Sequence, residues 1–498
     1  MSTPEFSAEA FEHYLGRSTL QHGPAAGAYT GAAGGASCGD LVRVSLGVDG
    51  GRITDASFDA EGCAATRAAT AAVAELSAGA TILDAAALAP ERLASELGGL
   101  SPAFAHAAEL AADALHRALS LLVADPTGRL STDDTAEHPR VLVALSGGVD
   151  SAVAALLERD NGADVVAVTL KLWADQRNDG ERSCCSPEAV LRARRLAHSL
   201  GLPHFTMDLT EDFRAGVVGP FLEGHREGTT PNPCVMCNGD VRIDAMVDLA
   251  RRLDAEGLAT GHYARVTDDG EGPLLGAPAD SEKDQTYMLS GVRPATLRDL
   301  RFPLAELTKP QVRALAERAG LPVASRPDSQ DLCFLAGEGK QAFLERHDGL
   351  DRRPGDVVDS SGHEIGRHPG HHNFTVGQRR GLGVAAGEPL YVLGTDAASN
   401  RVVAGPRAEL RITRVAIRDA VLHRDAETVD RVRLRYRSKP FACRVSKPEG
   451  GAGRGRHARL ALELTEHADA AAPGQTATLM AGERIVGHGT ITRLPDAA

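Results

Sequence analysis

The sequence predicts an α/β protein in which a parallel β-sheet forms the main domain and an antiparallel β-barrel follows at the C-terminal end. Two patterns predict this class. From Val141 onward, β-rich runs at 165–170 and 258–261 alternate with helical patterns at 187–200 and 241–253, which is the rhythm of parallel strands covered by helices on both faces. After about Gly366, short alternating runs are separated by Gly, Pro and Asp, which is typical of an antiparallel sheet.

The length of 498 residues is too great for one ordinary hydrophobic core and suggests about three or four domains. Residues 124–139 are rich in Asp, Thr, Gly, Ser, Glu and Pro, which is the composition of a linker. We therefore expect a front domain over 1–123, a linker over 124–139, an α/β domain over 140–300 to which 323–337 return, a central domain over 301–410 and the β-barrel over 411–498.

The composition excludes several classes of protein. No run of about 18 or more apolar residues occurs, and the first ten residues carry Glu5 and Glu9 rather than a basic flank, so we expect a cytoplasmic protein without a membrane segment. Eight cysteines are too few for a disulfide scaffold, so we expect reduced thiols, some of them reactive or metal-binding. The net charge of −13 argues against a polyanionic partner. However, the first 130 residues hold 15 acidic and 7 basic side chains, so local basic stripes decide that question better than the total.

A glycine-containing loop follows the first strand of the α/β domain. The apolar run 141–145 leads directly into the string Ser146, Gly147, Gly148, Val149, Asp150 and Ser151. The glycines allow a tight turn whose N–H groups approach an anion, and the Ala-rich helix expected at 152–157 points its positive end at the same place. Asp150 can hold a Mg²⁺ ion that shields phosphates. The loop lacks the lysine of G-x-x-x-x-G-K-[ST] and resembles the pyrophosphatase loop (PP-loop) of enzymes that adenylate a substrate oxygen. The alternative is an ordinary connection between a strand and a helix.

Three thiols lie in two distant segments. Residues 230–238 form a Pro-braced loop that carries the C-x-x-C pair Cys234 and Cys237, and Cys333 follows in the string 325–334. Such a pair can be half of a zinc site, a redox couple or part of an iron-sulfur ligand set. A structural zinc site would need a second pair at similar spacing, which the sequence lacks. Three thiols together with an adenylating loop indicate sulfur transfer.

The motifs together resemble the tRNA-specific 2-thiouridylase (MnmA) family from about residue 140 to the C-terminus. The residues that carry this resemblance are the loop at 146–151, Gly261-His262-Tyr263-Ala264, Lys283-Asp284-Gln285, Cys333 and the string 377–383. The resemblance implies a PP-loop ATP pyrophosphatase domain of the adenine nucleotide alpha hydrolase-like type, followed by a central tRNA-binding domain. It also implies ATP-dependent 2-thiolation of the wobble uridine of tRNAs with Lys, Glu and Gln anticodons, with sulfur from a cysteine desulfurase or a sulfur carrier.

The resemblance further assigns roles to residues. The ATP site would be Ala144, Leu145, Ser146, Gly147, Gly148, Val149, Asp150, Ser151, Leu170 and Gly261. The target base would lie by Asn232, Pro233 and Cys234, with further tRNA contacts at Lys283, Asp284, Gln285, Arg435 and Tyr436. Cys237 would be the nucleophile and Cys333 the persulfide carrier. Gly239, Ile243 and Leu170 depart from the residues usual in this family.

The chemistry leaves two routes for sulfur. ATP and Mg²⁺ would convert the C2 oxygen of uridine to an adenylate, which sulfur then displaces. In one route the terminal sulfur of a Cys333 persulfide attacks and Cys237 resolves the intermediate as a disulfide. In the other, Cys234, Cys237 and Cys333 hold a [4Fe-4S] cluster whose fourth iron carries sulfide. Two other functions stay open, namely another adenylating enzyme of the same loop class and a non-catalytic iron-sulfur or persulfide carrier.

A basic stripe occupies every second position near the C-terminus, at Arg431, Arg433, Arg435, Arg437 and Lys439. At strand periodicity these charges would share one face, where tRNA phosphates could neutralise them. The alternative is a solvated outer face of the barrel.

The front of the chain resembles the NifU/IscU-type iron-sulfur scaffold over about residues 10–122. Cys38, Asp40, Cys63 and His106 match the ligand pattern, but Ala107 stands where that scaffold has a third cysteine. The domain could therefore accept a persulfide or zinc, dock a cysteine desulfurase, or be a degenerate scaffold. We expect the flexible link to keep it at high local concentration beside the thiolation site. The alternative is a purely structural appendage.

Overall fold

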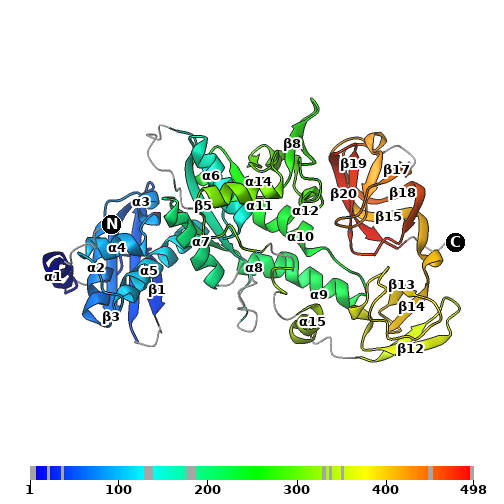
Figure 1. Cartoon of the computed structure of the whole chain (residues 1–498), viewed down its shortest axis with the longest axis horizontal. Helices are drawn as coiled ribbons and strands as arrows, with labels where there is room; N and C mark the ends of the chain where they lie inside the picture. The colour runs from blue at the N-terminus through cyan, green and yellow to red at the C-terminus, as the bar shows by residue number, and fades with distance from the viewer. Residues whose placement is uncertain are drawn as a thin grey trace.

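The computed structural model describes residues 7–19, 23–34, 39–127, 130, 138–173, 175, 187–327, 332–335, 339–348, 353–446 and 452–493. Cys38 lies outside the described residues. Figure 1 shows the front domain at one end of an elongated molecule, the α/β domain in the middle, and the C-terminal barrel and the central domain at the other end. None of the described helices is both long enough and apolar enough to cross a bilayer.

The front domain has an α+β architecture, which is what its resemblance to the NifU/IscU-type scaffold implies. Strands β1 (Tyr29–Gly34), β2 (Leu41–Asp49) and β3 (Arg52–Glu61) form an antiparallel sheet in that order. Its helices are α1 (Ala8–Arg17), α2 (Ala64–Ser77), α3 (Ile82–Ala86), α4 (Pro90–Glu96) and α5 (Ala105–Ala124). A Cβ atom at Gly31 would lie 2.1 Å from the carbonyl oxygen of Ala114. The missing side chain therefore lets α5 lie directly on β1.

The α/β domain contains the predicted parallel sheet, in the order β10-β7-β4-β5-β6. Its strands are β4 (Arg140–Ala144), β5 (Asp164–Lys171), β6 (His204–Asp208), β7 (Leu258–Thr260) and β10 (Leu300–Arg301), with the helices α6 (Val149–Asp160), α7 (Pro187–Ser199), α11 (Ile243–Arg252) and α14 (Lys309–Arg318). The side chains of β4 and β5 are almost continuously buried, as expected of strands covered on both faces.

The boundary between the α/β and central domains differs from the expected one at residue 301. Strand β10 pairs in parallel with β7, and α14 packs on α6. Val312 and Val323 lie in the same hydrophobic core as Val141. Residues 300–323 are therefore part of the α/β domain. The sequence did not show this because a two-residue strand is too short to produce a pattern.

The central domain contains a four-stranded mixed sheet in the order β12-β11-β14-β13. Its strands are β11 (Gly355–Val358), β12 (Glu364–His368), β13 (Leu390–Asp396) and β14 (Arg401–Pro406).

The predicted C-terminal barrel is also confirmed. It has the order β15-β18-β17-β16-β19-β20 and is closed by pairing of β15 with β20. The barrel strands are β15 (Arg411–Leu422), β16 (Arg431–Arg433), β17 (Phe441–Ser446), β18 (Gly455–Asp469), β19 (Thr476–Ala481) and β20 (Arg484–Thr492). The hairpin β8 (Arg265–Asp268) and β9 (Pro273–Gly276) of the α/β domain extends the barrel sheet along β20.

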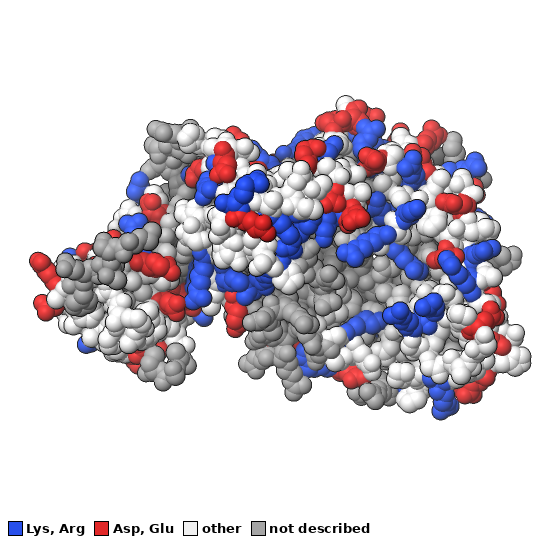
Figure 2. Space-filling model, in the orientation of Figure 1, with Lys and Arg blue, Asp and Glu red and all other residues white. Residues whose placement is uncertain are grey.

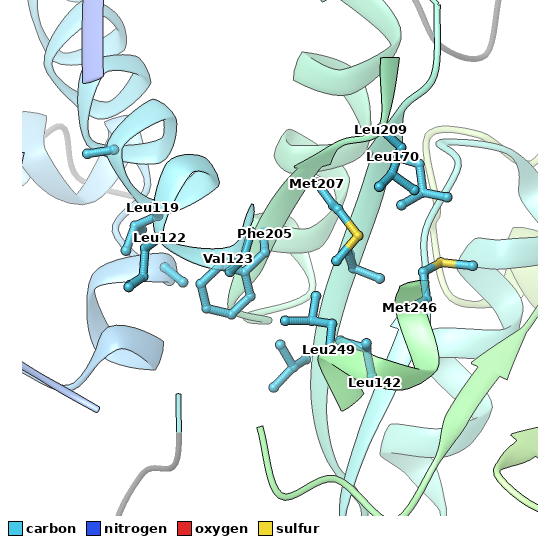
Figure 3. Close-up of a cluster of buried hydrophobic side chains, with 14 of the residues drawn as sticks. Leu119, Leu122, Val123, Leu142, Leu170, Phe205, Met207, Leu209, Met246 and Leu249 are labelled. Carbon is cyan, nitrogen blue, oxygen red and sulfur yellow. The ribbon is translucent and has the colours of Figure 1, made fainter. Parts of the chain in front are cut away.

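The front domain is docked on the α/β domain, whereas the sequence predicted a domain held by a flexible link. Helix α5 packs against β6, and Figure 3 shows Leu119, Leu122 and Val123 beside Phe205 in one apolar cluster. A guanidinium nitrogen of Arg194 lies 2.9 Å from the Asp113 carboxylate, and both side chains are largely buried.

Three histidines from both domains, two of them buried and His198 half-buried, also meet at this junction, and we call them the histidine cluster. They are His116 of α5, His198 of α7 and His204 of β6, with ring centroids 5.1 to 6.5 Å apart. Burial lowers the pKa of all three, and the nearby charge of Arg194 acts in the same direction. The junction is therefore a packed interface whose imidazoles are held neutral.

Candidate functional site: a thiol pocket beside the glycine loop

A cavity of about 240 Å³ lies at the carboxyl ends of β4 and β5, where open parallel sheets bind their ligands. One wall is made by Ala144, Leu145, Ser146 and Leu170 of the expected nucleotide site. The cavity is also lined by Cys234, Cys237 and Cys333, and by Pro233 and Gln285. The structure therefore brings thiols from two distant segments to one pocket beside the glycine loop.

The glycine loop is braced by its own serines. Gly147 has a φ of 71°, and Gly148 is the N-cap residue of α6. The Ser151 hydroxyl accepts a hydrogen bond from the Ser146 backbone N–H at 3.1 Å and donates to the Gly148 carbonyl at 3.1 Å. A Cβ at Gly261 would lie 2.6 Å from the Ser151 nitrogen. Gly261 is thus required for the close approach of its segment to the start of α6.

Asp150 is held by two residues that the sequence analysis did not assign to the site. The Lys309 ammonium lies 2.8 and 2.7 Å from the two carboxylate oxygens, and the Tyr263 hydroxyl donates to one of them at 2.9 Å. Lys309 is 8% exposed. A lysine therefore lies beside the glycine loop, but it comes from the first turn of α14 and not from the loop itself.

The signal for Lys309 in the sequence is only partial. Thr308 caps α14 and forms a capping box with Gln311, a pattern that indicates where a helix starts. It does not indicate that this helix end faces a loop about 160 residues earlier in the chain. Asp280 also contributes, because its carboxylate accepts the Lys309 backbone N–H at 2.8 Å.

The first thiol loop is organised by Asn232. Its side-chain oxygen accepts hydrogen bonds from the backbone N–H groups of Cys234 and Val235, at 3.1 and 3.3 Å, and so caps the short helix α10 (Pro233–Met236). The π-helix η2 (Cys237–Arg242) follows directly. Cys237 is buried and Cys234 is half-buried. Asn232 therefore positions the thiol loop.

The pocket also contains one histidine, His262. Burial, and secondarily the charge of Arg242, lowers the pKa of His262 to about 3. One ring nitrogen lies 2.9 Å from the Thr260 hydroxyl. His262 is thus a neutral, oriented side chain in the pocket wall.

The expected tRNA contacts at 283–285 have partners inside the protein. The Asp284 carboxylate lies 2.8 Å from a guanidinium nitrogen of Arg433, and both side chains are largely buried. The Gln285 side chain accepts the backbone N–H of Tyr263 at 2.8 Å. The backbone N–H of Lys283 donates to the Asp280 carbonyl at 3.1 Å. This segment therefore joins the α/β domain to the barrel.

The basic stripe does not form one strand face. Strand β16 ends at Arg433, and Arg437 has a φ of 62°. Arg435 is half-buried and donates to the Val376 carbonyl at 3.2 Å. The ring of Tyr436 is half-buried, 6.3 Å from that of Tyr287. The prediction of a continuous strand was wrong because a turn and an internal ion pair replace the expected alternation.

The front domain has a second candidate site. Ligand atoms of Asp40, Cys63 and His106 lie within 4.8 Å of one another, and the described residues contain no other such group of three. Burial raises the pKa of Asp40, but hydrogen bonds from Thr66 and from the Cys63 backbone outweigh it, so the net shift is downward. Ala107 is fully buried and brings no ligand. One thiol, one imidazole and one carboxylate fit a single zinc ion better than a cluster that needs several thiolates.

Sequence models of four known domains match the chain in order. The NifU-like N terminal domain matches residues 7–125, the tRNA methyl transferase HUP domain 139–337, the tRNA methyl transferase PRC-barrel domain 341–406 and the aminomethyltransferase beta-barrel domain 411–491. The fold and pocket thus define a HUP-domain protein with a NifU-like front domain.

Similar proteins show which family within this class the chain belongs to. The bifunctional protein NifU/MnmA of Rubrobacter xylanophilus is 43% identical over 476 residues, covering 93% of this chain and 94% of the relative. The tRNA-specific 2-thiouridylase MnmA of Chloroflexus aurantiacus is 40% identical and covers 72% of this chain and 99% of its own length. That of Sorangium cellulosum is 43% identical over 71% of this chain and 92% of its own length. The chain belongs to the bifunctional NifU/MnmA family.

Proposed function

We propose that this protein is a tRNA-uridine 2-sulfurtransferase that makes 2-thiouridine at the wobble position, using ATP. The observation that carries the proposal is the single cavity in which Cys237 and Cys333 lie beside Ser146 of the glycine loop. The MnmA relatives bear the name tRNA-specific 2-thiouridylase, which supports the same reaction. A carrier protein would not need a nucleotide loop beside its thiols.

The first step is adenylation of the C2 oxygen of uridine. The base oxygen attacks the α-phosphorus of ATP and pyrophosphate leaves, so the poor leaving group becomes AMP. The N–H groups at 146–151 and the start of α6 face the departing pyrophosphate. Asp150 is the carboxylate for Mg²⁺, which prefers oxygen ligands. Lys309, 2.7 Å from Asp150, supplies a further positive charge beside the phosphates.

The second step is sulfur transfer. Cys333 carries the sulfur as a persulfide, whose terminal sulfur attacks C2 and displaces AMP. The Cys237 thiolate then attacks the Cys333 sulfur, which forms a Cys237–Cys333 disulfide and releases the 2-thiouridine. An external thiol reductant returns both cysteines to thiols with two electrons. A cysteine desulfurase or a sulfur carrier supplies the persulfide sulfur.

A [4Fe-4S] cluster is the alternative sulfur carrier. Cys234, Cys237 and Cys333 line the same pocket and offer the three thiolates that such a cluster with an open iron needs. When bound, the cluster would supply a site for exogenous sulfide, and Cys234 would be a ligand. The anaerobic absorbance spectrum separates the routes. A band near roughly 400 nm that disappears in Cys234→Ser and Cys333→Ser supports the cluster.

A basic surface supports the proposal that tRNA, a polyanion, is the substrate. Figure 2 shows Lys and Arg side chains gathered over the middle of the visible face, between the α/β domain and the barrel. Arg435 and Tyr436 are partly accessible and remain proposed tRNA contacts. Lys283, Asp284 and Gln285 also remain proposed tRNA contacts, in the segment that joins the α/β domain to the barrel. The proposed substrates are tRNAs with Lys, Glu and Gln anticodons. The proposed location is the cytoplasm, where such tRNAs are found.

The front domain is proposed to bind iron-sulfur species or zinc. Asp40, Cys63 and His106 would hold the metal, with Cys38 as the further candidate ligand. Because the described ligands include a single thiol, we expect metal analysis of the purified chain to find zinc at this site rather than a stable cluster.

The test is reconstitution with the full chain. Unmodified tRNA transcript, ATP, Mg²⁺ and a sulfur source are mixed with the protein, and the nucleosides are analysed by mass spectrometry. We expect 2-thiouridine with the parental chain and none with Cys237→Ser or Asp150→Asn. Cys443→Ala is the matched control, because Cys443 is buried in the barrel core and away from the pocket. No 2-thiouridine from the parental chain with any sulfur source would reject the function.

A further inference from the structure

The segment that leads to Cys333 is attached to the glycine loop by Arg326. We call residues 323–335, of which 323–327 and 332–335 are described, the carrier segment. A guanidinium nitrogen of Arg326 donates to the carbonyl oxygen of Gly147 at 3.1 Å, although the two residues are 179 positions apart. Arg326 is half-buried, and Val323 is buried in the core of the α/β domain. The loop proposed for pyrophosphate is therefore in direct contact with the segment proposed to carry sulfur.

This contact sets the direction of one peptide group in the glycine loop. A trans peptide is planar, so its carbonyl oxygen and its N–H point in opposite directions. Because the Gly147 carbonyl points at Arg326, the N–H of Gly148 in the same peptide points away from it. Gly148 is the N-cap residue of α6, and N–H groups at the start of a helix bind anions. Arg326 thus orients an N–H group of the kind that binds phosphate.

Helix α14 connects the same two places a second time. Arg313 donates to the carbonyl oxygens of Ala324 and Arg326, at 2.8 and 3.1 Å. The ammonium of Lys309 lies 2.7 Å from the Asp150 carboxylate in the glycine loop. Residues four apart are neighbours on one face of a helix, so a single face of α14 contacts both the loop and the carrier segment. The contacts form a closed ring that includes the loop, the helix and the start of the carrier segment.

The second described part of the carrier segment is also held in place. The backbone N–H of Leu335 donates to the Leu332 carbonyl at 2.9 Å and closes a turn that contains Cys333. The adjacent side chain, Phe334, is buried, and its ring centroid lies 5.2 Å from that of Phe221. The carrier segment is thus fixed at two places, first at the glycine loop and then in an aromatic core beside the thiol pocket.

We propose that Arg326 is a positioning residue that couples the glycine loop to the carrier segment, so that an occupied nucleotide site holds Cys333 in place for sulfur transfer. Phosphate bound by the Gly148 N–H favours the peptide orientation in which the Gly147 carbonyl accepts from Arg326. The anion and the guanidinium therefore stabilise the same state of one peptide, and each strengthens the binding of the other. The inference rests on the proposed function and extends it, because adenylation then orders the segment that acts in the next step.

Amide hydrogen exchange of the full-length protein tests the coupling. The probe is Mg²⁺ with α,β-methylene-ATP, in which the bond broken in adenylation is replaced. The reporters are the backbone N–H groups of Ala324 and Leu335, each of which closes a turn. At saturating probe, we expect both to exchange at least about fivefold more slowly in the parental chain and to change less than about twofold in Arg326→Met. Arg326→Lys keeps a hydrogen-bond donor and should recover part of the response. Arg318→Met is the matched control, because Arg318 is exposed in the last turn of α14.

Turnover gives the second readout, as the amount of 2-thiouridine formed for each pyrophosphate released. This ratio should fall at least about threefold in Arg326→Met and recover in part in Arg326→Lys, because adenylation proceeds without an ordered carrier segment. Reporters that do not respond in the parental chain, or that respond equally in Arg326→Met, would overturn the proposal. The proposed function fails separately. Glycine-loop amides that ignore the probe would reject the nucleotide site itself, whereas a loop that responds without the carrier segment rejects the coupling alone.

Discussion

Replacement of Lys309 by methionine tests whether the Asp150–Lys309 pair is part of the nucleotide site. The ammonium lies 2.7 Å from the nearer carboxylate oxygen. At an effective dielectric constant of about 20, two unit charges at this separation attract each other by about 6 kcal/mol before desolvation. The net loss is much smaller, because the Lys309 side chain is 10% exposed but that of Asp150 is 31% exposed. Water can therefore hydrate the carboxylate that is left behind.

We expect Lys309→Met to lower the free energy of unfolding by about 1–2 kcal/mol. For a domain of this size that lowers Tm by about 2–8 °C, which thermal unfolding of the full chain measures. The activity should fall further than the stability. Because we propose that the ammonium also lies beside the phosphates of ATP, ATP-dependent release of pyrophosphate should fall at least about tenfold, equivalent to about 1.4 kcal/mol in the barrier.

A double-mutant cycle with Asp150→Asn isolates the pair. In the Lys309→Met background, Asp150→Asn removes a carboxylate that has lost its cation, so the double variant should be at least as stable as Lys309→Met alone. The coupling free energy should then be about 1–2 kcal/mol. If the two single losses add to within about 0.5 kcal/mol in the double variant, the pair does not interact in solution and the reasoning fails.

Three further predictions concern the packing around the site. Lowering the pH from 6.5 to 5.5 should lower the free energy of unfolding by up to about 1.4 kcal/mol for each member of the histidine cluster. Burial lowers the pKa of these imidazoles in the folded protein. As the pH falls, the unfolded chain therefore binds protons at these residues before the folded protein does, which favours unfolding. In His116→Gln the slope of unfolding free energy against pH should be shallower, and an unchanged slope would contradict the assignment. Gly239→Val should lower the free energy of unfolding in urea by about 1–3 kcal/mol, because the new side chain would meet Gly291. An unchanged urea midpoint would show that the π-helix η2 moves to accommodate the side chain. Arg433→Ala should lower the free energy of unfolding by about 3 kcal/mol, because it leaves the Asp284 carboxylate buried without its guanidinium partner. Amide hydrogen exchange in β16 should become faster, and unchanged protection of β16 would contradict the role of this ion pair in joining the two domains.

The sequence predicted the parts of the site that depend on local pattern. A continuous apolar run ending in Ser146-Gly147-Gly148 specifies a buried strand, a turn and a helix start within one short segment. Because this loop directly follows the strand, it lies at the carboxyl edge of the parallel sheet, where such sheets bind ligands. The meeting of Cys237 with Cys333 followed from chemistry and resemblance rather than from pattern, and the structure places both in one pocket.

The residues that the sequence missed depend on contacts between distant segments. Lys309 reads as an ordinary residue in the first turn of a capped helix, and its role appears only when α14 packs on α6. The basic stripe failed for a related reason, because alternation was taken to mean a strand. Arg433 is instead used by Asp284, and the backbone turns at Arg437. Alternation predicts a shared face only while the strand continues.

The front domain shows the limit of inferring motion from composition. The linker composition at 124–139 predicted a tethered domain whose effectiveness comes from high local concentration. That reasoning requires the domain to move, but Arg252 donates to the carbonyl oxygens of Val123 and Asp125, at 2.7 and 2.6 Å, and pins the end of α5 to α11. With the Arg194–Asp113 pair, these contacts hold the front domain against the α/β domain. A polar linker indicates a segment that does not enter a core, and it says nothing about whether the domains on either side of it pack together.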